Sequence, residues 1–366
     1  MTVCAALLFL MLSPTVLAIG EAEIQQAQKE VYGISEAEQA IPQEARELLG
    51  DVRIENASDP ESLFDRILDA VGLNFGEILR DSLRNVCQIL LVGVLTTAFC
   101  FLSSGKEHAA LTSMTGAMTA AALGASQACS YIPQSAEMIR TLSVYSGKLL
   151  PALCASAAAG GAITSAGAKY AIASTVLNLF CLVSTRLLIP FVYQFTALVI
   201  AAHVFQNDLL LSVASVAKRV LKLLMLGTAG ILSALLALSG AMHGAADTLA
   251  SKAAKATIST VLPVVGGILS DAAGTITSGA SYMCSGIGVI GIACVLSVCV
   301  LPYLMLGAHY LLYRCMSAFC ASAADHRFSG LLNGLSDVYA MLLGLTGTAA
   351  FAVLASILSL TRAVST

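Results

Sequence analysis

Hydrophobic residues dominate the chain after residue 85, in runs long enough to cross a lipid bilayer. A bilayer crossing needs about 20 mainly apolar residues in a helix. The runs are rich in Ala and Leu and lack the alternation of barrel strands, so they predict helices. They cover approximately Val86–Leu102, Ala109–Cys129, Tyr170–Phe205, Val220–Gly240, Tyr282–Leu312 and Ala340–Leu360.

Two of these runs are too long for one straight crossing. The run at 170–205 contains Pro190, and the run at 282–312 contains Pro302. Because proline interrupts helical hydrogen bonding, each run is either two crossings or one long kinked helix. The pattern therefore predicts five to eight spans.

Two further segments are amphipathic rather than uniformly apolar. In 207–222, Leu209, Val213, Val216 and Val220 share one helical stripe opposite a basic cluster at 218–222, and 242–262 shows a similar division. Such segments are typical of helices that lie along a membrane or in a polar cleft. The basic cluster favours the cytoplasmic side.

The start of the chain has a different character. Residues 1–18 form a short apolar core with small residues before Ala18, which indicates a signal peptide, with an uncleaved anchor as the alternative. Residues 21–81 then hold 15 of the 22 acidic side chains against five basic ones. Asp59-Pro60-Glu61 predicts the start of an amphipathic helix. We therefore expect 19–85 to be an acidic, helical, extracytoplasmic region and 86–366 to be a multi-pass membrane domain.

Composition agrees with this picture. The chain of 366 residues is 57% hydrophobic and only 11% charged, which predicts an all-α polytopic membrane protein in contact with the lipid bilayer. No basic patch with interleaved aromatic residues supports nucleic-acid binding. The 11 cysteines contain no C-x-x-C pair and lie in apolar runs, so we expect packing roles and neither a metal site nor a cofactor.

An internal repeat is indicated at a separation of 112 to 113 residues. Leu150-Pro151 and Leu262-Pro263 are each followed by Gly-X-Ile-Thr-Ser, at Gly161 and at Gly274. The repeat halves would be about 108–215 and 220–330, with interrupted or re-entrant segments at corresponding places. Chance similarity in a chain rich in Ala, Gly and Ser is the alternative. The candidate structural or pore residues are Pro151, Gly160, Gly161, Pro263, Gly266, Gly267 and Asp271.

The sequence contains no supported catalytic set. It has no H-E-x-x-H motif and no phosphate-binding loop. Ser281 and His309 lack the glycine pattern of an intramembrane serine protease, so we expect no enzymatic activity and only mild effects of replacing either residue by Ala. Asp271 could ligate a cation or cap a helix, and Arg186 is either an intramembrane charge or part of a loop. Small residues four apart, at Gly116, Ala120 and Gly124 and at Gly330 and Gly334, predict close helix packing.

Four short segments follow one another in the part of the chain from about residue 60 to 360. Leu262–Gly267 with Ser270-Asp271 is the most specific, and Leu149–Pro151, Gly286–Gly291 and Leu335–Val338 accompany it. With the translocated acidic head, these segments make the chain similar to the stage III sporulation protein AE family of endospore-forming bacteria.

The resemblance implies a multi-pass protein of the mother-cell membrane around the forespore. Its partners would be other membrane proteins of the same sporulation complex and a forespore-membrane protein, with several copies of the chain as a further expectation. Together they would form a secretion-like transenvelope channel. The competing hypothesis is a stand-alone secondary transporter, which the shortage of intramembrane carboxylates disfavours. An intramembrane enzyme is a more distant alternative.

Overall fold

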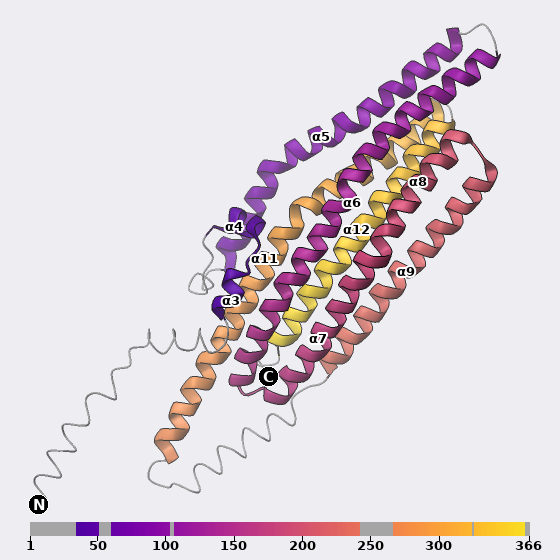
Figure 1. Cartoon of the computed structure of the whole chain (residues 1–366). Coiled ribbons are helices and arrows are strands. Elements are labelled where there is room, and N and C mark those ends of the chain that lie inside the picture. Colours follow the sequence, from indigo (N-terminus) through magenta and orange to yellow (C-terminus); the bar gives the residue numbers. More distant parts are fainter. Residues whose placement is uncertain (1–33, 51–59, 103–105, 242–265, 324–325, 363–366) are drawn as a thin grey trace, which may run out of the picture.

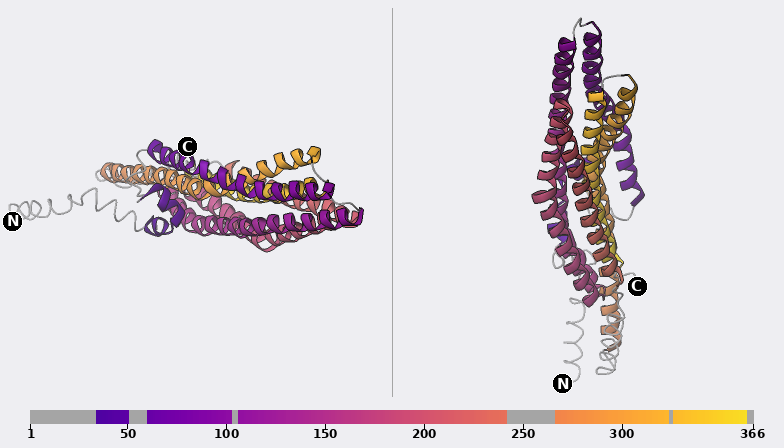
Figure 2. Two further views of the ribbon diagram at one scale, coloured as in Figure 1. Left: turned by 90° about the horizontal axis from the view of Figure 1, so that it is seen from above. Right: turned by 90° about the vertical axis from the view of Figure 1, so that its right-hand side faces the viewer.

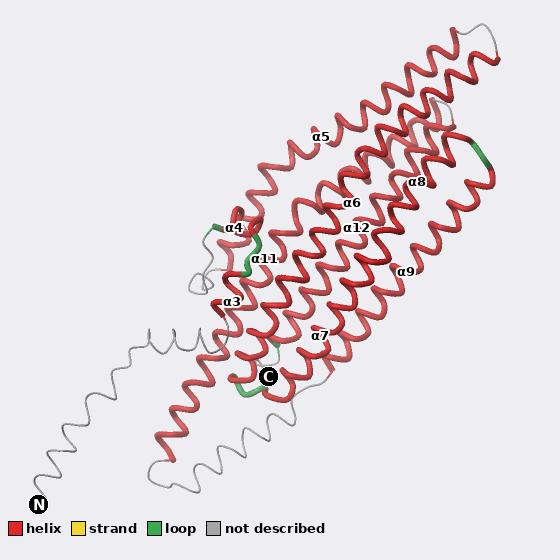
Figure 3. Tube along the Cα trace, in the orientation of Figure 1, coloured by secondary structure: helices red, strands yellow, loops and turns green. Residues whose placement is uncertain are grey.

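The computed structural model describes residues 34–50, 60–102, 106–241, 266–323 and 326–362, which form helices and short turns without any strand (Figures 1 and 3). The predicted signal peptide, the amphipathic segment 242–262 and Pro263 lie outside this part of the chain. The all-α prediction is confirmed. The helices are α3 (Ile34–Gln39), α4 (Gln43–Leu49), α5 (Pro60–Leu102), α6 (Lys106–Ala159), α7 (Ile163–Val183), the π-helical turn η2 (Ser184–Leu188), α8 (Ile189–Phe205), α9 (Asp208–Ala241), α11 (Gly266–Ala323) and α12 (His326–Thr361).

The long helices run up and down in one elongated bundle (Figures 1 and 2). At one end, which we call the α8–α9 end, α5, α8 and α11 finish and α6, α9 and α12 begin. At the other, the α6–α7 end, α6 passes into α7 and α12 finishes. The two most buried helices, α11 and α12, pack against each other in the interior, and α5 and α9 lie at opposite edges.

Four described helices are long and apolar enough to cross a membrane. They are Glu61–Leu102, Ile163–Phe205, Ser278–Ala321 and Phe328–Thr361. This is fewer than the five to eight spans expected. In α6, Thr, Ser and Gly dilute the apolar run at 109–129, while the run at 220–240 in α9 extends beyond the residues whose side chains are described.

The two longest apolar runs are each one continuous helix, which decides between the alternatives left open by the sequence. In the first, α7 continues through η2 into α8. The N–H of Ile189 donates to the carbonyl of Ser184, five residues back, immediately before Pro190. Proline has no N–H and its ring crowds the carbonyl four residues earlier, so a π-helical turn here lets the helix continue. Pro302 lies inside α11, which also continues.

The described helices of the acidic head lie against the side of the bundle. Ala37, Ile41, Ala45 and Leu49 of α3 and α4 are buried, and a small cavity separates α3 from Tyr145, Leu149, Ile287 and Ile290. The Arg66 guanidinium donates to the Leu49 carbonyl at 2.6 Å, which ties α4 to α5. As predicted, α5 begins at Pro60, and it runs without a break through the expected domain boundary at 85–86.

Candidate functional site

The first of the two repeated segments is interrupted, as expected. Pro151 lies inside α6, whereas Gly160 and Gly161 form the turn into α7. Gly161 has φ of 103° and donates to the Ala158 carbonyl, while the N–H of Ala162 donates to the Ala157 carbonyl. These are the two hydrogen bonds of a Schellman motif, in which the left-handed residue is usually glycine. Gly161 therefore has a defined structural role.

The second segment differs in its described part. Gly266 and Gly267 are the first two residues of α11, and Asp271 lies farther along the same helix. From Gly266 to Ala280 the backbone is continuously helical, so it has no counterpart of the turn at Gly160 and Gly161. The interruption predicted for this copy is thus not found within the described residues.

The amphipathic stripe of α9 faces outward. Leu209, Val213, Val216 and Val220 are 76%, 54%, 55% and 40% exposed, while the opposite side of the helix turns toward α12. In a water-soluble bundle the apolar stripe would face the core. Of the polar side chains in this part of α9, Lys218 turns to Asp337 of α12, whereas Ser212, Ser215, Arg219 and Lys222 are exposed. An outward apolar stripe is the arrangement expected of a helix in contact with lipid.

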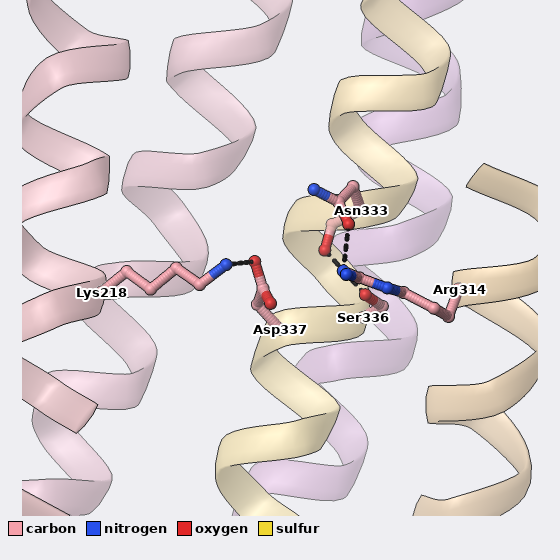
Figure 4. A network of polar contacts seen from close by, with 5 residues as sticks. All are labelled: Lys218, Arg314, Asn333, Ser336 and Asp337. Atoms are coloured by element: carbon pink, nitrogen blue, oxygen red, sulfur yellow. Dashed lines mark hydrogen bonds and ion pairs between the residues drawn. The ribbon is translucent and has the colours of Figure 1, made fainter. Parts of the chain in front are cut away.

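A charged network joins α9, α11 and α12 (Figure 4). Lys218 Nζ lies 2.5 Å from Asp337 Oδ2, and Asp337 is only 16% exposed. On the neighbouring side of α12, the Arg314 guanidinium donates to the Asn333 side-chain oxygen, and the Ser336 hydroxyl donates to the Asn333 carbonyl. Asp337 is the sole formal charge between Phe328 and Thr361, and Arg314 is the sole one between Ser278 and Ala321. The isolated charges of two candidate spans therefore lie about one helical turn apart along α12, each with its own partner.

At the same level, on another side of α12, polar and aromatic side chains from four helices pack together. We call this group the polar cluster. Its Tyr313 hydroxyl donates to Gln127 Oε1 at 2.5 Å, and Ser82 Oγ lies 3.1 Å from His309 Nδ1. The cluster consists of Ser82 of α5, Gln127 and Tyr131 of α6, His309 and Tyr313 of α11, and Tyr339 of α12.

The aromatic rings of the polar cluster lie in direct contact. The His309 ring is 4.6 Å from that of Tyr131 and 5.2 Å from that of Tyr339, centroid to centroid, and Tyr313 is also 5.2 Å from Tyr339. His309, Tyr313 and Tyr339 are almost fully buried. Aromatic pairs at such spacings add about 0.5–1.5 kcal/mol each beyond the area they bury. The cluster thus fastens α6, α11 and α12 together.

The hydrogen bonds of His309 argue against a serine–histidine catalytic pair. Its Nδ1 lies 2.8 Å from the Met305 carbonyl oxygen, which can only accept, so Nδ1 carries the proton. It follows that Nδ1 cannot take a proton from Ser82. Ser281, the serine considered from the sequence, lies 28 residues earlier than His309 in the same helix, about 40 Å away. These two residues do not meet.

Two further cations, Lys169 and Arg186, lie in the candidate span Ile163–Phe205 and have different surroundings. Lys169 in α7 is buried, and its Nζ donates to the Ser359 carbonyl in the last turn of α12 at 3.2 Å. A cation at a helix C-terminus is favourable because the unpaired carbonyls there are partially negative. Arg186 lies in the π-helical turn η2 with its side chain exposed, so it belongs to a helix and not to a loop.

Metal and thiol chemistry receive no support from the described residues. No three His, Cys, Asp or Glu side chains in them are grouped to hold a metal ion, and the described cysteines are free thiols. Four of those cysteines are buried between helices, where they pack as small apolar residues.

Sequence reasoning did not identify the charged network or the polar cluster. A local signal existed for the cluster, because Gln127 and Tyr131, and His309 and Tyr313, are polar residues four apart, on one face of each helix. For the network, the signal was a single aspartate in an apolar run. What the sequence could not show was which helices these faces meet. The arrangement holds the helices in register and contains no group placed for catalysis among those described.

The outward apolar stripe of α9 and the four apolar helices are those of a membrane protein. Comparison with curated proteins and with solved structures gave no match. A family model, described as stage III sporulation protein AE, matches residues 46–363, which is nearly the whole of the chain. The chain therefore belongs to the stage III sporulation protein AE family.

Proposed function

We propose that this protein is a membrane component of the transenvelope channel between mother cell and forespore, a secretion-like complex required for sporulation. The family match over residues 46–363 carries the proposal. The protein would lie in the mother-cell membrane and act by assembly, or as part of a conduit, with other membrane proteins of the complex and a forespore-membrane partner. Four apolar helices and interhelical contacts made by structural rather than reactive groups support a role without enzymatic activity.

The test is genetic replacement in an endospore-forming host, read as the number of heat-resistant spores. Loss of the gene should abolish those spores, and the native chain should restore them. At matched protein level, Gly266→Leu or Gly267→Leu should fail to restore sporulation, because these glycines belong to the proline–glycine segment Leu262–Gly267 that most specifically carries the family resemblance. Ser281→Ala should restore it fully. Normal sporulation without the gene would refute the proposal.

A stand-alone secondary transporter is the second candidate, favoured by one observation. Asp337 is a carboxylate inside a candidate span with a single cationic partner, Lys218, an arrangement that ion-coupled transporters use. The two candidates are separated by isolating the protein from sporulating cells under mild detergent. A transporter is recovered alone, whereas a channel component is recovered with the other membrane proteins of the complex.

A further inference from the structure

One side of α6 changes character along its length. Near its beginning, the exposed positions on this side are apolar or small: Leu111, Thr115, Met118 and Ala122. Farther along, the exposed positions on the same side are mainly polar or charged, at Gln134, Glu137, Arg140 and Lys148, with Pro133 and Val144 as the apolar members. The first set is suited to lipid, whereas the second set is suited to water.

Contacts at the two ends of the charged part of α6 show which segments of α11 and α12 lie beside it. At one end, the Tyr131 ring packs on His309 of α11 and Tyr339 of α12. At the other end, Gly291 of α11 lies against Leu149 of α6 and Ile357 of α12. The segment 131–149 of α6 therefore runs beside 291–309 of α11 and 339–357 of α12.

The neighbouring segments of α11 and α12 are apolar and free of formal charge. Neither 291–309 nor 339–357 contains an Asp, Glu, Lys or Arg residue. Each rises about 27 Å, close to the roughly 30 Å of a bilayer's hydrocarbon core. If these segments cross the membrane, the exposed side chains of Glu137, Arg140 and Lys148 lie at the depth of the hydrocarbon.

Charged side chains at that depth turn away from lipid, toward water or toward other protein groups. The cores of protein interfaces are depleted in charged residues and enriched in aromatic ones, and this part of α6 shows the opposite composition. Water is therefore the occupant that fits this face.

We propose that the exposed side of α6 bearing Gln134, Glu137, Arg140 and Lys148 lines a water-filled conduit at membrane depth. The apolar stripe of α9 faces the lipid. A face of mixed charge admits hydrated ions and polar solutes rather than apolar ones. This inference deepens the proposed function and rests on it, because it names the surface through which a conduit would run.

The experiment uses single cysteines and a membrane-impermeant maleimide on membranes opened to both sides. Test positions are Glu137→Cys, Arg140→Cys and Lys148→Cys. Controls are Leu223→Cys and Leu226→Cys in α9, which match the depth of Glu137 and Arg140 because their neighbour Met225 lies against Gly344 of α12. The parent chain gives the background from the native cysteines, and gel filtration in detergent identifies variants that remain folded.

The expected result is labelling several-fold above the parent at the three α6 positions and at the parent level in α9. Two outcomes would overturn the proposal. Parent-level labelling at folded α6 variants would mean that the face is covered by lipid or protein. Equal labelling in α6 and α9 would mean that this half of the bundle lies wholly in water. Labelling does not depend on spore formation, so failure of the proposed function in the genetic test is distinguishable from failure here.

Discussion

Asp337 is the sole formal charge between Phe328 and Thr361, and its carboxylate lies 2.5 Å from Lys218 Nζ in α9. A partly buried carboxylate without its partner would be costly, since little water can replace the lost interaction. Because the Lys218 side chain is 35% exposed, solvent screens part of the attraction. The pair thus positions α9 against α12 at moderate strength.

Replacing Lys218 or Asp337 by Ala should lower stability in either case, and the double variant should lose less than the sum of the two. The expected coupling energy is about 1 kcal/mol, a typical value for a partly exposed contact pair. Thermal unfolding of the detergent-solubilised variants measures it. Lys222→Ala, an exposed residue on the same helix, is the control. Strictly additive losses would show that the pair does not couple the helices.

Gly161→Ala should lower the stability of the turn between α6 and α7. A left-handed conformation costs a residue with a side chain about 1–2 kcal/mol relative to glycine. Gly160→Ala is the matched control, because Gly160 lacks the positive φ of its neighbour. The readout is the Tm of each purified variant. Equal Tm values for the two variants would contradict the assigned backbone role.

His309→Ala should be destabilising, and not mild as the sequence alone suggested. The ring is buried against Tyr131 and Tyr339, so its removal leaves a cavity and unpaired polar partners. Losses of about 2–4 kcal/mol are typical of such truncations. Ser281→Ala, in the same helix but outside the cluster, should leave the Tm unchanged. A stable His309→Ala protein would show that the cluster does not hold the bundle together.

At the scale of whole helices, the predicted small-residue positions are places of close approach. A Cβ atom at Gly116 would lie 2.0 Å from Thr96 Oγ1 and 2.7 Å from Thr96 Cβ, and one at Gly334 would lie 2.2 Å from a Val199 methyl group. Gly124 and Gly330 are similarly crowded. These contacts confirm the packing role that the four-residue spacing indicated.

Gly116→Ala should force α5 and α6 apart, because the added methyl group meets the Cβ of Thr96 and not merely a movable side-chain end. Overpacking of this kind costs about 1–3 kcal/mol. Gly147→Ala on the same helix is the control, since no heavy atom beyond its own helix lies within 4 Å of the added Cβ. Thermal unfolding should show a lower Tm for the first variant alone. An unchanged Tm at Gly116 would mean that the helices separate freely.

Local sequence signals predicted where helices form but not which helices pack against one another. The Asp-Pro-Glu signal placed the start of α5, because capping depends only on adjacent residues. Each of the two long apolar runs forms one helix and not two crossings because its proline is accommodated. At Pro190 the π-helical turn 184–188 accommodates it. The polar cluster draws on residues 82, 127, 309 and 339, which are spread over more than 250 positions of the chain. Packing decides such contacts, and periodicity within one helix contains no information on it.

At the scale of the whole molecule, the long helices run up and down, so each turn between them lies at one of the two ends of the bundle (Figure 1). Helix α5 runs from the acidic head to the α8–α9 end, where α6 begins at Lys106. Helix α6 then returns to the turn at Gly160 and Gly161. The basic cluster of Lys218, Arg219 and Lys222 lies in the first half of α9, toward the α8–α9 end. Positive residues favour the cytoplasmic side. The α8–α9 end is therefore expected in the cytoplasm, opposite the acidic head.

This orientation predicts the behaviour of a reporter that is active only in the cytoplasm. Truncated chains carrying it after Gln206, in the turn between α8 and α9, should give a strong signal. Fusions after Gly50 and after Gly161 should both be silent, because α5 and α6 together cross to the α8–α9 end and back. A strong signal at all three positions would mean that the bundle does not cross the membrane between its ends. The reversed pattern, with Gln206 silent and the other two active, would keep the antiparallel order but place the acidic head in the cytoplasm. That result would contradict the orientation expected from the basic cluster of α9.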